Sequence, residues 1–383
     1  MHITNDVVYV GINDHKIDLF EGKYVVPNGM SYNSYVILDQ KVAVMDSVDV
    51  GFGKEWLANL QAVLQDRQPD YLVVQHMEPD HSANVLAFVQ RYPNAKVVAT
   101  NKAFVMMKNF FGTDLAEKQL IVGDGDTLCL GNHTLTFVTA PMVHWPEVMM
   151  TYDQTDKILF SADAFGKFGA LDVQQDWLDE ARRYYVGIVG KYGAQVQAVL
   201  KKTSALQIEK ICSLHGPVLD SNINYYLGKY DLWSKYQAEF SGVAIAYTSI
   251  YGNTKQAVDL LEAQLLAKGV AVEKFDLARC DMPQAVAKAF AYDKLVLATT
   301  TYNNDVFPFM KEFINNLTER NFANKHVTLI ENGSWAPVAN KVMKSMLEKC
   351  KNLKFGDCIT IHSSMSDDNK NNIATLANSL AQK

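Results

Sequence analysis

Short apolar runs alternate with polar turns through the first 240 residues of the chain. Helical periodicity is less frequent there and predicts helices over GKEWLANLQAVLQ, SANVLAFVQRYP and the long DWLDEARRYYVGIVGKYGAQVQAVLKKTSA. The apolar runs have the length and the Val, Ile, Thr and Tyr content of β-strands; they are YNSYVILD, KVAVMDS, DYLVVQH, AKVVAT, QLIVGDGDTLCLG, HTLTFVTAP, EVMMTYD and KILFSAD. Many strands with helices at intervals predict two sheets covered by helices, an α/β sandwich.

The rhythm changes near residue 242, where strand-like runs begin to alternate strictly with amphipathic helical segments. These runs are GVAIAYTSI, VAVEKFDLA, KLVLATTTY, HVTLIENGS and FGDCITIHSS. Such alternation predicts a doubly wound parallel sheet with helices on both faces. The stretch before it, NINYYLGKYDLWSKYQAEFSG, is tyrosine-rich and helix-like, which predicts a packed connector. We therefore expect two domains, residues 1–241 and 242–383.

Composition and charge exclude several classes of function. The chain has 36 basic and 42 acidic residues, and no Lys/Arg cluster is interleaved with aromatic residues, so we expect no nucleic acid partner. The N-terminus lacks the basic and apolar regions of a signal peptide, and no window is apolar enough for a membrane span. We expect a soluble cytoplasmic protein. The five cysteines contain no C-x-x-C pair, and we expect each to be a small buried apolar residue rather than part of a disulfide framework or thiolate site.

Residues 76–84, HMEPDHSAN, place several metal-binding side chains within a few positions of one another. They lie between the strand-like DYLVVQ and the helix-like ANVLAFVQ, and loops at strand ends are where binding sites are commonly built. A lone histidine is more often an ordinary hydrogen-bonded residue. Here, however, further candidates also follow strand-like runs, and the full set is His76, Glu78, Asp80, His81, His144, Asp163 and His215. The set as a whole favours a metal site.

The order H-x-E-x-D-H followed by His, Asp and His resembles the metallo-β-lactamase superfamily over residues 1–240. That resemblance implies an αββα sandwich with a binuclear metal site. It assigns one metal to His76, Glu78 and His144, the other to Asp80, His81 and His215, and Asp163 to both. Zinc hydrolases of the superfamily carry histidine where this chain has Glu78, and the added carboxylate favours two irons over two zincs. Glu78 and Asp163 are the residues we expect to be catalytic.

A second candidate site begins in YTSIYGNTKQAVDLLEAQL, where a tight turn precedes a helix. Helix N-termini bind phosphate well. The turn has no G-K-[ST] of a triphosphate-binding loop, and no G-x-G-x-x-G of an NAD-binding domain follows the first strand. It resembles the phosphate loop of flavodoxins, with tyrosine in place of the middle threonine, and predicts FMN. The turn residues are Ser249, Ile250, Tyr251, Gly252, Asn253 and Thr254.

Two later loops, residues 299–308 and 331–337, occupy the positions at which flavodoxins enclose the isoalloxazine ring. The resemblance implies that Trp335 stacks on the flavin, although a core aromatic is the alternative interpretation of this residue. The other residues that it implies are Thr301, Tyr302, Asn303, Asn304, Gly333 and Ser334.

Both halves together resemble the flavodiiron proteins over the full chain, through YNSYVILD, HMEPDHSAN, HWPE, LFSADAFG and LHGP. The resemblance implies reduction of O2 to water, of NO to N2O, or of both, at a non-haem diiron centre supplied with electrons through FMN. Since the chain has no C-x-x-C pair, the donor should be a separate rubredoxin or NADH-linked reductase. The resemblance also implies the minimal two-domain form, assembled as a head-to-tail homodimer or a dimer of dimers.

Two other classes of function compete with this interpretation. One is a zinc-dependent hydrolase with a regulatory flavodoxin-like domain, which Glu78 disfavours. The other is a flavin-binding electron-transfer module with a structural metal, which the number of ligands disfavours because structural sites are normally closed and mononuclear. The preference for O2 or NO depends on groups beside the metals, for which Trp145, Phe168 and Tyr184 are candidates.

Overall fold

The computed structural model describes residues 1–382. The chain divides into two compact units, one from Met1 to Asp231 and one that begins at Leu232. No helix within residues 1–382 combines the length and the apolar character needed to cross a bilayer.

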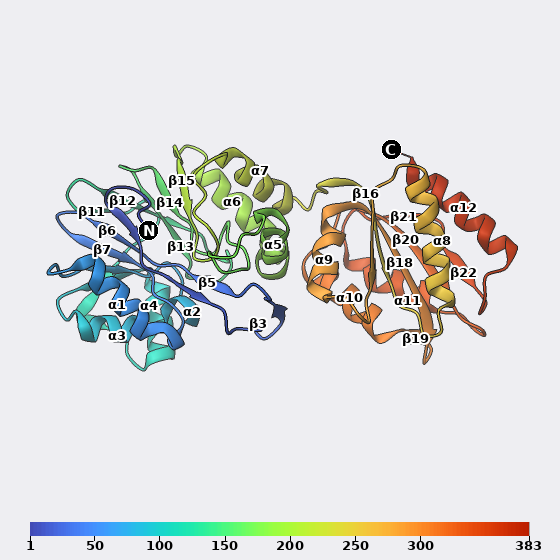
Figure 1. The fold of residues 1–383 in the computed structure, drawn as a ribbon, viewed down its shortest axis with the longest axis horizontal. Coiled ribbons are helices and arrows are strands. Elements are labelled where there is room, and N and C mark those ends of the chain that lie inside the picture. The colour runs from blue at the N-terminus through green and yellow to red at the C-terminus, as the bar shows by residue number, and fades with distance from the viewer. Residues whose placement is uncertain (383) are drawn as a thin grey trace. The chain divides into compact units, whose positions relative to one another are not determined.

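Two main sheets form the centre of the first unit (Figure 1). The first has the order β1 (Val7–Tyr9), β6 (Tyr35–Leu38), β7 (Val42–Met45), β8 (Tyr71–Val73), β9 (Lys96–Ala99) and β10 (Gln119–Ile121). The second has the order β11 (Thr127–Cys129), β12 (Thr134–Thr139), β13 (Met149–Asp153), β14 (Ile158–Phe160) and β15 (Lys210–Cys212). Short pairs also join β2 (Ile12–Asp14) to β5 (Met30–Tyr32) and β3 (Leu19–Phe20) to β4 (Tyr24–Val25).

The two main sheets share a hydrophobic core to which both contribute. Ile37 and Val98 of the first sheet are fully buried in one cluster with Phe137 and Phe160 of the second. Strands such as β7 and β14 are buried along their whole length, which is why they stand out in the sequence as short apolar runs. Helices cover the outer faces; they are α1 (Gly53–Leu64), α2 (Pro79–Ser82), α3 (Val85–Arg91), α4 (Asn101–Phe111), α5 (Trp177–Tyr184), α6 (Gly193–Thr203) and α7 (Ile223–Ser234). The predicted sandwich is confirmed.

The long helix predicted over residues 176–205 was wrong as a continuous element. After α5 the chain forms a π-helical turn, η3 (Tyr185–Val189), and a 3₁₀ turn, η4 (Gly190–Tyr192), before α6 begins. A Cβ at Gly187 would lie 2.7 Å from the Tyr24 ring, so a close approach of β4 coincides with the interruption. Helix α4 was not predicted from the sequence. It begins after Thr100, and the Thr100 hydroxyl accepts a hydrogen bond from the Ala103 amide.

In the second unit the sheet has the order β17 (Val272–Asp276), β16 (Phe240–Tyr247), β18 (Tyr292–Tyr302), β20 (His326–Asn332) and β21 (Lys354–Phe355). These strands are parallel. After β21, β22 (Ile359–Ile361) pairs in parallel with the later residues of β20. A short antiparallel strand, β19 (Asp305–Val306), pairs with β18. Figure 1 shows α8 (Asn253–Ala267) and α12 (Asp367–Ala381) on one face and α9 (Met282–Ala291), α10 (Pro308–Glu319) and α11 (Ala339–Met346) on the other. This is the predicted doubly wound fold, with a flavodoxin-like strand order.

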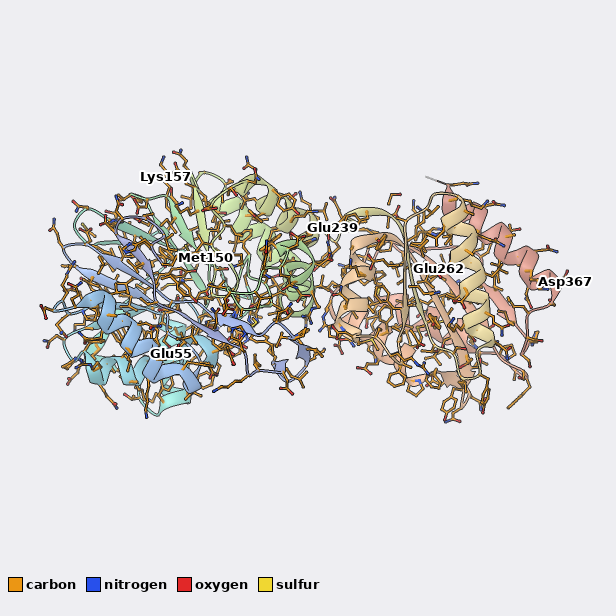
Figure 2. The ribbon with its side chains drawn as sticks, in the orientation of Figure 1. Glu55, Met150, Lys157, Glu239, Glu262 and Asp367 are labelled. Atoms are coloured by element: carbon orange, nitrogen blue, oxygen red, sulfur yellow. The ribbon has the colours of Figure 1, made fainter. Side chains whose placement is uncertain are left out.

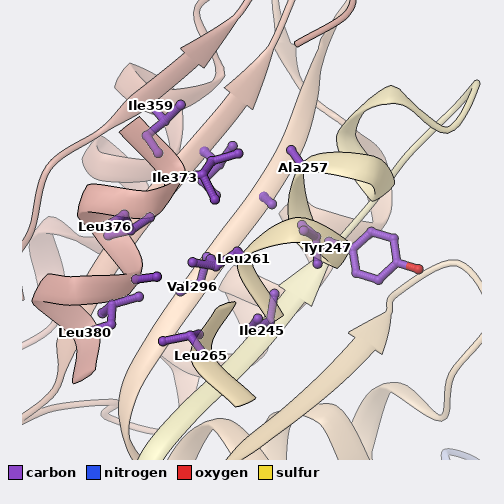
Figure 3. Packing of buried hydrophobic residues seen from close by; sticks show 14 of the residues in the cluster. Ile245, Tyr247, Ala257, Leu261, Leu265, Val296, Ile359, Ile373, Leu376 and Leu380 are labelled. Carbon is purple, nitrogen blue, oxygen red and sulfur yellow. The ribbon is translucent and has the colours of Figure 1, made fainter. Parts of the chain in front are cut away.

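The core of the second unit lies between its sheet and the α8–α12 layer. Leu261 and Leu265 of α8 and Ile373 of α12 close over Ile245 and Val296 of the sheet, as Figure 3 shows. Apolar side chains lie inside each unit and charged ones lie outside, as Met150 of β13, which is buried, and Asp367 of α12, which is exposed, illustrate (Figure 2).

The connector and the cysteines give mixed outcomes. Tyr230 of α7 is buried, and its hydroxyl accepts a bond from the Phe165 amide at 2.5 Å, so this helix is packed as predicted. The expectation that every cysteine is buried holds for Cys212 alone among the five, since Cys280 and Cys350 are partly buried and Cys129 and Cys358 are exposed. Both lie at short edge or loop positions where little chain covers them.

Candidate diiron centre and flavin pocket

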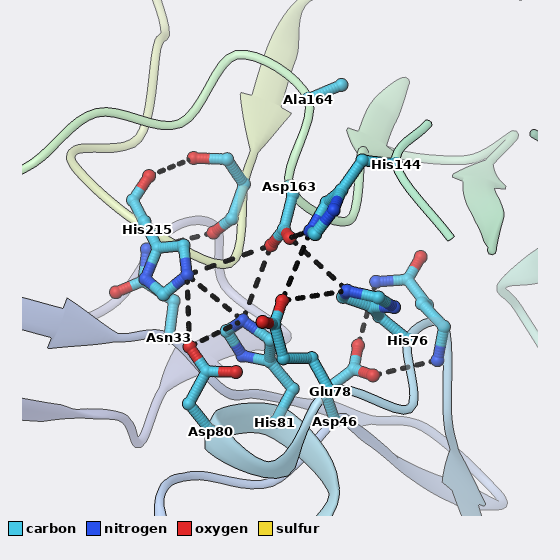
Figure 4. Close-up of polar contacts among 12 residues, drawn as sticks. Asn33, Asp46, His76, Glu78, Asp80, His81, His144, Asp163, Ala164 and His215 are labelled. Carbon is cyan, nitrogen blue, oxygen red and sulfur yellow. Dashed lines mark hydrogen bonds and ion pairs between the residues drawn. The ribbon is translucent and has the colours of Figure 1, made fainter. Parts of the chain in front are cut away.

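The ends of parallel strands bring the predicted metal ligands together. His76 and Glu78 lie in the loop after β8, and Asp80 and His81 lie on the short helix α2 that follows. Asp163 follows β14 and His215 follows β15, while His144 lies in the loop between β12 and β13. Figure 4 shows their side chains pointing toward one common space.

One group of side chains surrounds Oδ2 of Asp163. Nε2 of His144 lies 3.0 Å from this oxygen and 3.1 Å from Oε2 of Glu78. Nε2 of His76 lies 3.2 Å from the same Glu78 oxygen and 3.4 Å from Asp163 Oδ2. The ligand atoms of these four residues all lie within 4.8 Å of one another, as the ligands of one metal ion would.

A second group surrounds Oδ1 of Asp163. Nε2 of His81 lies 3.3 Å from it, and Nε2 of His215 lies 3.8 Å from it. Both ring nitrogens lie 3.3 Å from Asp80 Oδ2 and 3.1 Å from each other. The two oxygens of Asp163 therefore face different groups, which is the placement expected of a carboxylate shared by two ions.

Burial and opposite charges set the protonation of these groups. Burial lowers the pKa of His144, but Asp163 and Glu78 outweigh that effect and raise it to about 9. Burial raises the pKa of Glu78, but hydrogen bonds from His144 and His76 bring it well below its usual range. Burial also raises the pKa of Asp163, but the facing imidazoles lower it by more, so that the pKa lies well below its usual value. Glu78 and Asp163 are therefore ionised at neutral pH, as metal-binding carboxylates must be.

The donor set fits a pair of metal ions. Both carboxylate oxygens of Asp80 and Oδ1 of Asp163 are buried without a hydrogen-bond partner among residues 1–382. Such oxygens are costly to bury unless a charge or a metal compensates them. Four imidazoles and three carboxylates suit a mid-series transition metal better than Mg²⁺ or Ca²⁺, which prefer oxygen alone.

An outer layer of hydrogen bonds, which the sequence analysis missed, orients the ligands. Glu147 is buried, and its Oε1 accepts bonds from His76 Nδ1 and the Met77 amide, each at 2.8 Å. His215 Nδ1 donates to the Ser31 carbonyl at 2.7 Å. Metal-binding histidines characteristically use their second nitrogen in this way, which fixes the ring and raises its basicity. The HWPE segment contains Glu147, but nothing in its spacing identifies the partner.

Aromatic side chains line the same region, including the candidates named from the sequence. The Tyr184 ring lies 5.6 Å from that of His215 and 5.1 Å from that of Phe168, and Trp145 lies 5.2 Å from His76. Tyr184 is fully buried, and its hydroxyl has no partner among the described residues. Burial and the nearby carboxylates raise its pKa well above the usual range, so this phenol is a hydrogen-bond donor.

Glu21 is a further neighbour that the sequence analysis missed. It lies at the exposed turn between β3 and β4. Desolvation beside the site and the charge of Glu78 raise the pKa of its carboxyl to about 7. No motif marks this residue, because its proximity to Glu78 depends on how the turn folds over the site.

The predicted flavin loops line one cavity of about 460 Å³ in the second unit. Its lining contains all the predicted residues except Gly252, which instead caps α8 with a positive φ of 93°. Trp335 is 81% exposed, which excludes the alternative of a core aromatic. The lining also includes residues that were missed, namely Thr300, Asn332 and Ser363.

The start of α8 fits a phosphate group. The Thr254 hydroxyl is buried there without a partner among the described residues, and Ser249 Oγ accepts the Gly252 amide at 3.1 Å. No acidic side chain lies in the lining, all of which falls within residues 249–363. Free amides and hydroxyls at a helix N-terminus are the usual cradle for a phosphate monoester.

Comparison with known proteins identifies the family. The family model described as "ODP family beta lactamase" matches residues 30–216, and the one described as "Flavodoxin domain" matches residues 244–375. The crystal structure of the flavodiiron protein from Giardia intestinalis covers 99% of this chain, and 95% of that chain is covered, with a TM-score of 0.87 and 27% identity. The anaerobic nitric oxide reductase flavorubredoxin of Aliivibrio fischeri is 30% identical over 351 residues, which are 88% of this chain and 70% of that protein. The chain belongs to the flavodiiron protein family.

Other relatives of this flavodiiron protein agree with that assignment. A nitric oxide reductase of Moorella thermoacetica is 29% identical over 359 residues, 91% of this chain and 90% of that protein. Rubredoxin oxygen:oxidoreductase from Desulfovibrio gigas has the same fold, with a TM-score of 0.91, 23% identity and coverage of 100% of this chain and 97% of that one.

Proposed function

We propose that this flavodiiron protein reduces O2 to water, NO to N2O, or both, with electrons delivered through FMN to a non-haem diiron centre. The observation that carries the proposal is the double cluster around Asp163, whose two oxygens face two separate sets of ligands. Relatives named nitric oxide reductase support the activity, and they align along both units of the chain.

In this proposal His76, Glu78 and His144 would hold one iron, Asp80, His81 and His215 would hold the other, and Asp163 would contribute to both. When bound, two ferrous ions supply two electrons and open positions at which a diatomic gas is reduced. The surrounding chain limits access of water, since six of the seven residues are at most 9% exposed. The side chain of Glu78, the seventh, is 13% exposed.

Tyr184 is the residue that we propose as a hydrogen-bond donor toward a molecule in this site. Its hydroxyl is buried, remains protonated and has no partner among residues 1–382. A preorganised donor of this kind stabilises negative charge that develops on a reduced gas. Phe168 packs edge-on against Tyr184 and limits its movement.

The flavin pocket would hold FMN by its phosphate at Ser249, Asn253 and Thr254. The ring would lie between the 301–304 loop and the segment Gly333–Trp335, where the exposed Trp335 side chain has the room to stack on it. When bound there, FMN would supply one- and two-electron redox chemistry.

A zinc-dependent hydrolase with a regulatory flavodoxin-like domain is the less favoured function. The relatives are named as reductases, and Glu78 adds an anionic ligand to the first group. The second unit also has a cavity lined by the start of α8 and by the two predicted flavin loops, which a purely regulatory domain would not need.

Several features of the assembly belong to the proposal as well. We expect a separate donor, either rubredoxin or an NADH-linked reductase, functional domains at residues 1–241 and 242–383, and a cytoplasmic location. We also expect a head-to-tail homodimer or a dimer of dimers. The rate of electron transfer falls steeply with distance, and a two-fold symmetric pair of chains can place the flavin of each chain beside the metal centre of the other.

Metal analysis and gas-reduction assays test this proposal directly. Protein made with ample iron should contain about two irons and one FMN per chain. When O2 or NO is added to the anaerobic protein together with a chemically reduced donor, the protein should consume the gas. Asp163→Asn should lower the occupancy of both irons, whereas His215→Ala should mainly lower one. Two zincs without gas reduction, or equal losses in both variants, would contradict the assignment.

A further inference from the structure

A second cavity of about 630 Å³ lies in the unit that begins at Leu232. It is found at the amino ends of β18, β20 and β21, which run parallel, so their first residues gather at one edge of the sheet. The flavin loops follow the carboxyl ends of β18 and β20, so the two cavities lie at opposite ends of these strands.

The lining of this cavity is strongly basic. Lys294, Lys325 and Lys354 each lie at or beside the start of a strand, and His326 lies between them. Asp293 is the one acidic side chain in this lining, all of which lies within residues 293–382. Its Oδ1 already accepts the Gly242 amide at 2.8 Å, and its Oδ2 accepts Lys294 Nζ at 3.1 Å. Lys294 is therefore paired with Asp293, and Lys325 and Lys354 are the basic groups of the lining that no acidic side chain of the lining contacts.

Two buried nitrogens in the lining remain short of partners. Lys325 is only 2% exposed, and its ammonium donates to the Phe290 carbonyl at 2.6 Å, which leaves further N–H donors. Burial lowers the pKa of this ammonium to about 7. Nδ1 of His326 is also buried, with no hydrogen-bond partner among residues 1–382. A buried ammonium, or a buried polar nitrogen without a hydrogen-bond partner, is costly unless a ligand compensates it.

We propose that this cavity binds a small phosphorylated anion through Lys294, Lys325 and Lys354. A phosphate presents several strong acceptors and up to two negative charges, which suits a cavity lined by three lysines. The volume falls within the range of small-ligand sites. The lining contains no aromatic ring other than that of His326, so the phosphate rather than an attached base is what the site recognises. An acidic peptide fits less well, because the most buried ammonium, Lys325, is almost inaccessible from the surface.

Calorimetric titration of the iron- and FMN-loaded protein with inorganic phosphate tests this site, at constant ionic strength and with chloride as the reference anion. Bound FMN keeps phosphate out of the flavin pocket, and phosphate contact with iron would be common to all variants. We expect saturable binding of about one phosphate per chain, weakened roughly tenfold by Lys354→Gln, since a hydrogen bond to a charged group is lost. Lys325→Met should weaken binding at least as much.

Lys354 is exposed, so its replacement should not disturb folding even if the Lys325 variant is unstable. Lys268→Gln is the matched control, because Lys268 is an exposed lysine after α8 and outside the cavity, and this variant should bind as the wild type does. Absence of saturable binding, equal binding by Lys354→Gln and wild type, or binding of a polyglutamate peptide but not of phosphate would each overturn the proposal.

Discussion

Replacing Glu147 by glutamine should weaken metal binding at one position of the diiron centre without altering any ligand. The Glu147 carboxylate is 2% exposed and receives two hydrogen bonds on Oε1, from His76 Nδ1 and from the Met77 amide. Glutamine has nearly the same shape and can accept both bonds. The change therefore removes the charge while the geometry is kept.

The size of the effect follows from that change in charge. A hydrogen bond to a charged group contributes about 1.5–3 kcal/mol and a neutral one about 0.5–1.5 kcal/mol. The difference, roughly 1–2 kcal/mol, corresponds to a loss of about 5- to 30-fold in affinity. Mutation of the hydrogen-bond partners of metal-binding histidines typically lowers metal affinity or activity about 10- to 100-fold, a range that overlaps the loss derived from the hydrogen bond. Only the ion held by His76 should be affected strongly.

Competition for iron against a chelator of known affinity would measure the loss, with iron counted per chain at each chelator concentration. Asp153→Asn is a matched control, because Asp153 is an equally buried carboxylate that accepts a bond from a histidine, His133, outside the centre. It should leave iron affinity unchanged. If Glu147→Gln holds both irons as tightly as the wild type, or loses both equally, the proposed orienting role is wrong.

Three further predictions concern the flavin, the assembly and a buried histidine. Thr254→Glu places a negative charge against the phosphate cradle at the start of α8 and should remove FMN while sparing iron, as absorption and metal analysis would show. Mixing Asp163→Asn chains with Thr254→Glu chains should restore gas reduction if each flavin serves the other chain's metals; verified mixed dimers without activity would argue against head-to-tail assembly. His133 is buried 2.8 Å from Asp153, which raises its pKa against the effect of burial. The contribution of protonated His133 to the free energy of unfolding should be complete below pH ~6.5 and should decline as pH rises through the raised pKa. In a plot of the free energy of unfolding against pH, His133→Gln should remove this decline.

Local apolar runs predicted most of the strands because each strand carries its own signal. In β12, Leu135 and Phe137 are buried and Thr136 between them is partly exposed, and such a pattern can be recognised without knowledge of the fold. The helix over residues 176–205 failed for the opposite reason. Its interruption coincides with the approach of Tyr24 to Gly187, two residues that are far apart in the sequence.

The clustering of several candidate metal ligands follows in part from strand topology. Asp163 and His215 each follow a strand, and β14 and β15 are parallel neighbours, so the loops after them must meet. The groups that tune the ligands depend instead on side-chain placement across the fold. Glu147 reaches His76 across 71 positions of sequence, and Ser363 meets Ser334 in the flavin pocket across 29. A carboxylate or hydroxyl at such a position looks like any other polar residue until the strands are in place. Sequence therefore specifies which atoms can bind the metals and the flavin, whereas the packed structure determines how basic those atoms are.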